Sequence, residues 1–224
     1  APPTARRSTV RGFNGPGSAV GGDYFDFFEL SDDKIGIIIA DVTGHGLPAA
    51  LLMANLQAAV RVAMGRDTPL PELASRINRL ICRNTASETF ITAILASVIA
   101  STGEIELVNA GHPGPLLFGE SVRVFSSEHS SLPLGIEPDE QFEVQRIAPP
   151  DYDDAILFFT DGMNEAAGED SSLLGISPVI EAISELPQRT TSAMIRTARS
   201  VVRSHLQGAA NNDDMTFLAL HLTS

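Results

Sequence analysis

The order of strand-like and helix-like segments constrains the fold of this chain more than any other feature of its sequence. Residues 34–40 are the clearest strand, because Ile35, Ile37, Ile38 and Ile39 form a nearly continuous β-branched run. Such a run is typical of a strand that is buried on both faces. A fold with this strand at its centre must cover it on two sides, which requires layers above and below one sheet.

The remaining segments fall into blocks of one kind. Residues 23–30 are expected to form a strand before this one, and two helices are expected after it, one with Pro48 in its first turn and one with Pro69 near its start. Residues 1–9 read as a strand lead-in or a linker remnant, and residues 12–18 as a turn-rich loop. The later expected strands are residues 90–100, 104–110, 115–118, 122–125, 141–147, 155–160 and 215–222. Two further helices are expected around residues 179–186 and 195–205.

Blocks of strands and helices, rather than strict alternation, argue against a doubly wound parallel sheet. We expect an α+β fold, an α/β/β/α layered sandwich in which two mainly antiparallel sheets are flanked by helix pairs. Residues 1–224 are expected to form a single domain. Because the chain begins at Ala1 without an initiator methionine, we expect it to be an excised part of a longer regulatory protein.

Charge and hydropathy exclude several classes of function. The formal net charge is −13, from 28 acidic and 15 basic residues. Nucleic acid is therefore not an expected partner, because binding its phosphates requires a clustered basic face. No apolar stretch approaches the roughly 20 residues that span a bilayer, so no membrane association is expected and the expected location is cytoplasmic.

Aspartates recur where the expected strands begin or end. Asp23 opens one strand, Asp41 closes another, Asp161 closes a third, and Asp213 with Asp214 precedes the last. Each lies close to a turn or to glycines, which let the backbone approach a ligand closely. Oxygen ligands without cysteine favour Mg²⁺ or Mn²⁺ over zinc. Each aspartate alone fits an ordinary turn or cap better than a site, and spacing alone does not show that they converge.

Five segments in order resemble one family. They are residues 21–28 (GGDYFDFF), 41–54 (DVTGHGLPAALLMA), 109–113 (NAGHP), 159–166 (FTDGMNEA) and 213–216 (DDMT). This set is similar to the stage II sporulation protein E and sigma-B-regulator branch of the bacterial protein phosphatase 2C family. The resemblance spans nearly the whole chain and implies a layered sandwich and a metal-dependent serine/threonine phosphatase. One departure is Asn164, where threonine is common in the family.

The resemblance also implies roles for individual residues. Asp41 would bridge two divalent cations, Mn²⁺ or Mg²⁺, and Asp161 and Asp213 would complete the shell of one of them. Asp23, directly or through water, and the backbone carbonyl of Val42 would serve the other. Whether Asp214 also binds metal is left open, and Asp26 is expected to be a supporting or surface group.

Two cations roughly 3.5–4 Å apart acidify a bridging water and orient a phosphoryl group for in-line attack, so Asp41 and Asp161 are the expected catalytic residues. Gly44 and Gly46 precede the first helix and are expected to present backbone N–H groups to the phosphate of the substrate. His45 and His112 are candidates for a general acid, but both lie in turns between small residues, and a structural role is preferred for each.

For partners, the resemblance implies a phosphorylated anti-sigma-factor antagonist as substrate and an upstream sensor or receiver domain, and it leaves a homodimer open. Control of the site is expected to pass through the first helix pair, which directly follows Asp41. The alternative is a catalytically silent docking module with the same fold, although none of the expected metal aspartates is missing. Another metal-dependent hydrolase, such as a phosphodiesterase, is less favoured, because the five histidines lack ligand spacing.

Overall fold

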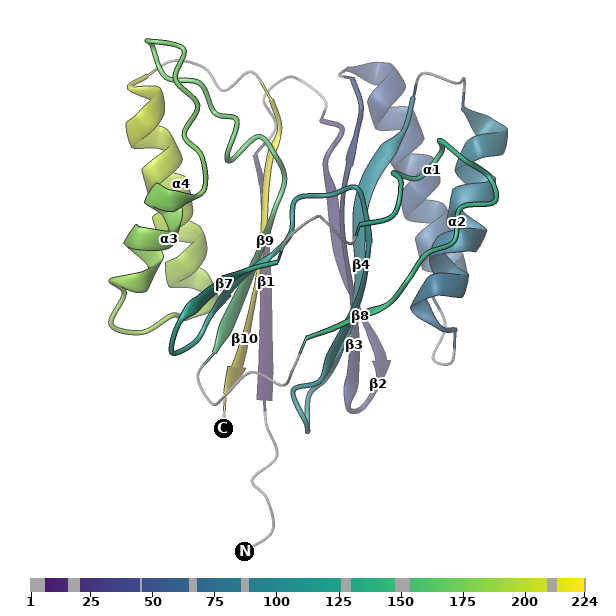
Figure 1. Cartoon of the computed structure of the whole chain (residues 1–224), viewed down its shortest axis with the longest axis horizontal. Helices are drawn as coiled ribbons and strands as arrows, with labels where there is room; N and C mark the ends of the chain where they lie inside the picture. Colours follow the sequence, from purple (N-terminus) through teal and green to yellow (C-terminus); the bar gives the residue numbers. More distant parts are fainter. Residues whose placement is uncertain are drawn as a thin grey trace, which may run out of the picture.

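Two five-stranded sheets pack face to face, and each carries a pair of helices on its outer face (Figure 1). This computed structural model describes residues 7–15, 21–44, 46–64, 68–85, 89–125, 130–147, 154–208 and 213–223. All the neighbouring strands in both sheets pair antiparallel. The expected α/β/β/α sandwich is therefore confirmed.

The first sheet brings the two ends of the described chain together. Its order is β1-β10-β9-β6-β7, with β1 at Arg7–Gly15, β10 at Met215–Thr223, β9 at Ala155–Phe159, β6 at Leu116–Phe118 and β7 at Val122–Val124. Strand β1 pairs with β10 along its whole length, from Arg7 opposite Thr223 to Gly15 opposite Met215. Strand β1 therefore joins this sheet only by pairing with β10.

The second sheet is built mostly from consecutive strands. Its order is β2-β3-β4-β5-β8, with β2 at Tyr24–Ser31, β3 at Lys34–Val42, β4 at Ile91–Ile99, β5 at Ile105–Ala110 and β8 at Gln145–Ile147. Strands β2 to β5 are connected as neighbours, with the helix pair inserted between β3 and β4.

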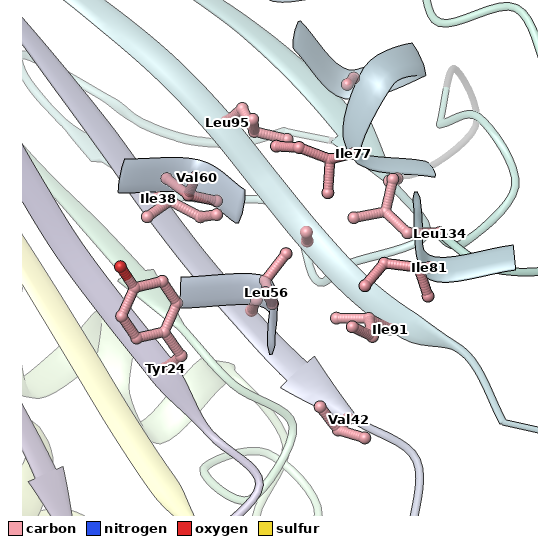
Figure 2. Close-up of a cluster of buried hydrophobic side chains, with 14 of the residues drawn as sticks. Tyr24, Ile38, Val42, Leu56, Val60, Ile77, Ile81, Ile91, Leu95 and Leu134 are labelled. Atoms are coloured by element: carbon pink, nitrogen blue, oxygen red, sulfur yellow. The ribbon is translucent and has the colours of Figure 1, made fainter. Parts of the chain in front are cut away.

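Helices α1 (Leu47–Ala63) and α2 (Leu70–Asn84) cover the second sheet, whereas α3 (Ser177–Ser184) and α4 (Thr191–Leu206) cover the first. Figure 2 shows Ile38 and Leu95 of the sheet packed against Leu56, Val60 and Ile77 of the helices. Within the described residues, none of the helices combines the length and hydropathy needed to cross a bilayer.

Strand β3 is buried on both faces, as its isoleucine run predicts. Ile38 and Ala40 pack under the first helix pair, and Ile37 and Ile39 point into the core between the sheets. Successive side chains of a strand alternate between faces, so odd-numbered residues of β3 lie between the sheets. This alternation carries Asp41 to the inner face at the end of the strand.

Two predictions about the strands were wrong at their boundaries. Residues 12–15 belong to β1 rather than to a loop, because pairing with β10 satisfies their backbone and Gly12 leaves room for the Phe25 ring. A methyl group at Gly12 would lie 2.0 Å from that ring. The rest of the expected loop, residues 16–18, lies outside the described residues. The strand expected at residues 141–147 is limited to Gln145–Ile147, where it pairs with β5.

Candidate metal centre

The space between the two sheets changes from apolar to polar at one end. Along its length it is filled by side chains such as Ile37, Ile94, Phe158 and Leu218. At the end where β9 stops and β10 starts, the buried residues are polar: Asp23, Asn109, His112, Thr160, Asp214 and Thr216. Arg7 and Thr223 pair at the opposite end of the first sheet. Polar side chains at this depth require partners, so this end of the sandwich is the candidate site.

Asp23 is held across the two sheets by Thr160. The Thr160 hydroxyl donates to Asp23 Oδ2 at 2.7 Å, although the two residues are 137 positions apart in the chain. The same hydroxyl accepts from the backbone N–H of Thr216 at 2.9 Å. Asp23 therefore joins the start of the second sheet to the ends of β9 and β10.

Asp41 and Val42 lie against the Gly21–Gly22 segment. A methyl group at Gly22 would lie 3.2 Å from the Val42 carbonyl oxygen and 3.7 Å from Asp41 Oδ1. Beyond Val42, the Thr43 backbone N–H and hydroxyl both donate to the Phe90 carbonyl at 3.0 Å. These bonds continue the pairing with β4 and fix the backbone that leads out of Asp41.

The acids that follow β9 and precede β10 are also neighbours. A methyl group at Gly162 would lie 1.9 Å from the Asp214 carbonyl oxygen and 3.6 Å from Asp213 Cβ, so only glycine allows this approach. Asp214 is buried, and its Oδ2 accepts a hydrogen bond from the Gly22 N–H. Asp213 is exposed, and its Oδ1 accepts from the Asp214 N–H at 2.8 Å.

Burial and mutual repulsion perturb these carboxyl groups. Burial, reinforced by the charges of Asp23, Asp161 and Asp213, raises the pKa of Asp41 to about 8. Burial also raises the pKa of Asp23 to about 7, against the hydrogen bond from Thr160. The pKa of Asp161 is raised as well, by burial and then by Asp213 and Glu165. Mutual effects of this kind require that the carboxyl groups lie near one another.

The donor chemistry of this cluster fits hard divalent cations. The carboxylates repel one another, and a backbone carbonyl lies beside them, which is an all-oxygen set of the kind Mg²⁺ and Mn²⁺ prefer. The described ion pairs join Arg61 to Asp26, Arg76 to Glu72 and Arg146 to Glu106, all outside the cluster. Within the described residues, no three His, Cys, Asp or Glu side chains have the arrangement of a preformed metal site. The fit therefore rests on charge and donor type.

The other predicted residues lie around this cluster. Gly44 and Gly46 have positive φ angles of 92° and 76°, and a methyl group at either would meet nothing within 4 Å. Their backbone is therefore open at the start of α1, while His45 lies outside the described residues. Asp26 points to the helix side of β2, where it accepts from Tyr24 at 2.9 Å and from Arg61 at 2.6 Å.

A family model agrees with this geometry. The model of the stage II sporulation protein E family (SpoIIE) matches residues 31–223. The chain belongs to this family. Its relatives are PP2C-type serine/threonine phosphatases, which depend on metal ions.

Curated relatives show how similar the chain is to named proteins. The phosphoserine phosphatase RsbU of Bacillus subtilis (strain 168) is 28% identical over 159 residues, which cover 70% of this chain and 47% of RsbU. The chain spans 36% to 47% of the length of the curated relatives it matches.

Solved structures show the same fold. The PP2C phosphatase domain of SpoIIE from Bacillus subtilis, solved with a fragment of its regulatory domain, matches with a TM-score of 0.84 at 17% identity, over 97% of this chain and 64% of that one. RsbX in complex with magnesium matches with a TM-score of 0.71 at 16% identity, over 97% and 96% of the two chains.

Sequence reasoning missed the groups that support the SpoIIE-type carboxylates. The sequence pattern predicts Thr160 only as the end of a strand, although its hydroxyl holds Asp23. Glu165 was not singled out, although its charge raises the pKa of Asp161. The alternation of β9 is the signal that could have identified Thr160, because Ile156 and Phe158 lie on the same inner face.

Proposed function

We propose that the chain is a metal-dependent phosphatase that hydrolyses phosphoserine or phosphothreonine on a partner protein. The observation that carries the proposal is the group of neighbouring carboxylates at one end of the sandwich, whose pKa values are raised by burial and by nearby carboxylates. A bound cation relieves this repulsion, so such a group favours cation binding. Membership in the SpoIIE family supports phosphate-ester hydrolysis as the reaction at the proposed cation site.

In this proposal, Asp41 would be a ligand shared by two divalent cations, Mn²⁺ or Mg²⁺. Asp161 and Asp213 would hold them from the side of the first sheet, and Asp23 and the Val42 carbonyl would hold them from the other side. When bound, the cations supply an activated water and neutralise charge on the phosphoryl oxygens.

The residues of the chain orient these groups and control access. Thr160 fixes Asp23, and Thr43 fixes the backbone after Val42. The open backbone at Gly44 and Gly46 faces solution at the start of α1, where N–H groups can bind phosphate oxygens. His112 is only 1% exposed, which rules it out as the acid that protonates the leaving oxygen.

We further infer that residues 1–224 act as one phosphatase domain, since each sheet takes strands from both halves of the chain. The substrate class that we propose is a phosphorylated anti-sigma-factor antagonist, delivered by protein–protein contact, with control by an upstream sensor or receiver domain. The name of the relative RsbU, a phosphoserine phosphatase, supports a phosphoserine substrate. A homodimer is compatible with these partners.

The test is hydrolysis of p-nitrophenyl phosphate and of a phosphothreonine peptide with Mn²⁺ and with EDTA. We expect turnover only with metal, and a loss of at least about 100-fold in kcat/KM for Asp41→Asn and Asp161→Asn. Asp139→Asn, at an exposed aspartate away from the site, is the matched control and should keep native turnover. A phosphotyrosine peptide tests the substrate class.

Two outcomes contradict this proposal. Turnover that persists unchanged in EDTA or in Asp41→Asn would exclude the metal mechanism. Absence of turnover together with absence of Mn²⁺ binding by calorimetry would favour the silent docking module. Binding of Mn²⁺ without turnover would agree with a domain that requires its activating partner.

A further inference from the structure

The turn after β5 is locked by its own side chains. The Asn109 amide donates to the His112 carbonyl at 2.9 Å, and its Oδ1 accepts from the His112 N–H at 2.8 Å. Gly111 has a φ angle of 70°, and a methyl group there would lie 2.6 Å from Pro133 Cγ. Because a side chain at position 111 would be both strained and blocked, this turn requires glycine before His112.

The His112 ring is sealed inside the protein. Its Nδ1 is 2.8 Å from the Thr92 hydroxyl. Burial lowers the pKa of His112 to about 3, and the backbone of Phe159 acts in the opposite direction. At Nε2, no hydrogen bond of ordinary geometry forms within the described residues. The ring is therefore neutral at physiological pH, and it contacts both sheets.

Thr92 lies beside Asp41 in the strand pairing as well as against this ring. In the β3–β4 pair, Thr92 lies directly opposite Asp41. Ile39 and Ile94, two positions from each, both point between the sheets, so the Asp41 and Thr92 side chains share that face. Side chains directly opposite in an antiparallel pair have Cβ atoms about 4.5–5.5 Å apart. On the other sheet, Phe159 precedes Thr160 and Asp161.

We propose that His112 is a positioning residue for the metal site. Its ring holds the Thr92 hydroxyl in place, and through that hydroxyl it holds the Asp41 carboxylate in place. This inference rests on the function proposed above. An aliphatic side chain would fill the space without fixing the hydroxyl, and a neutral ring adds no positive charge that would repel a cation. His112 touches no reacting atom, so its effect is on the placement of Asp41.

The test compares Mn²⁺ affinity by calorimetry across matched variants of the full chain. His112→Leu removes both ring nitrogens, and Thr92→Val removes the hydroxyl at nearly constant volume. We expect each to weaken Mn²⁺ binding by about tenfold or more, as the loss of groups that orient metal ligands does. The double variant should bind Mn²⁺ about as tightly as the weaker-binding single variant, because the two substitutions remove the same interaction.

Two further variants separate positioning from folding. His112→Asn keeps a hydrogen-bonding atom near the place of Nδ1, and we expect it to restore affinity to within about threefold of the native value. His221→Leu removes a buried imidazole from the opposite end of β10 and should leave Mn²⁺ affinity within about twofold, whatever its effect on the unfolding temperature.

Native Mn²⁺ affinity in folded His112→Leu would overturn the inference. An equal loss of Mn²⁺ affinity in His112→Leu and His112→Asn would overturn it as well. If His112→Leu does not fold, Thr92→Val decides, and native affinity in that variant overturns the inference. Absence of Mn²⁺ binding by the unmodified chain would instead contradict the proposed function, and this inference with it.

Discussion

At the scale of single residues, Asp41 lowers the stability of the metal-free fold and favours the binding of cations. It ends a strand whose other residues are almost entirely buried, and Asp23, Asp161 and Asp213 act on it electrostatically. Its ordinary pKa of 3.8 rises to about 8, so ionisation of the side chain is unfavourable in the folded protein. A residue with this property reduces the stability of the metal-free fold and favours the binding of cations.

This property predicts how the stability of the metal-free protein varies with pH. An aspartate with a raised folded pKa retains its proton between about pH 4 and pH 8, while the unfolded chain releases it. The fold therefore loses stability as pH rises through that window. In EDTA, Asp41→Asn should be more stable than the native protein by about 1–3 kcal/mol at pH 8 and nearly equal to it near pH 4.

Urea unfolding at pH 4.5, 6 and 8 measures this difference near both ends of the window and inside it. Asp139→Asn is the control and should follow the native curve. A difference between Asp41→Asn and the native protein that stays constant with pH would contradict the raised pKa.

Gly162 is the second residue whose identity the site requires. Its Cα faces the Asp214 carbonyl so closely that an added methyl group must displace the backbone of residues 213–214. Gly162→Ala should cost about 1–3 kcal/mol and weaken Mn²⁺ binding by about tenfold. Gly36→Ala is the matched control, because its methyl group would meet only the flexible side chains of Met64 and Leu30.

Thermal unfolding and Mn²⁺ titration of the two glycine variants would separate these effects. Native Mn²⁺ affinity in Gly162→Ala would show that the close approach of residues 162 and 214 serves the fold alone.

At the scale of elements, the alternation of strand β2 decides which aspartates join the site. Asp23 precedes the strand on the side of the inner face, where it meets Thr160. Asp26, three positions later, points to the helices and pairs with Arg61 of α1. Two aspartates three positions apart therefore have different environments.

The alternation predicts opposite results for these neighbours. Asp23→Asn should weaken Mn²⁺ binding by about tenfold or more. Asp26→Asn should leave it within about twofold and lower stability by at most about 1 kcal/mol, because the Arg61 partner is largely exposed. Calorimetric titration of both variants checks this, and equal losses would show that β2 does not separate the two faces.

The elements also show what sequence patterns can predict. The isoleucine run at residues 35–39 predicted a doubly buried strand, since periodicity depends on local sequence alone, and β3 confirms it. The boundary of β1 was wrong, because pairing with the last strand of the chain overrides the turn preference of Gly12 and Gly15. Tertiary pairing of this kind is not encoded in local composition.

At the scale of the whole molecule, the candidate site belongs to neither sheet alone. Asp23 and Asp41 come from the second sheet, and Asp161 and Asp214 flank strands of the first. Family resemblance named these residues, whereas the Thr160 and His112 contacts emerged only from packing over long sequence separations. The site should therefore form only when the complete sandwich folds, and bound cations should stabilise the whole domain.

The most direct test of the account is calorimetric titration of the metal-free chain with Mn²⁺ at pH 8, beside Asp41→Asn. We predict two ions per native chain, with release of protons because the pKa values of Asp23 and Asp41 are raised. Asp41→Asn should bind at least about 100-fold more weakly, since the bridging carboxylate is lost. Equal Mn²⁺ affinity in the two proteins would contradict a metal centre at this end of the sandwich.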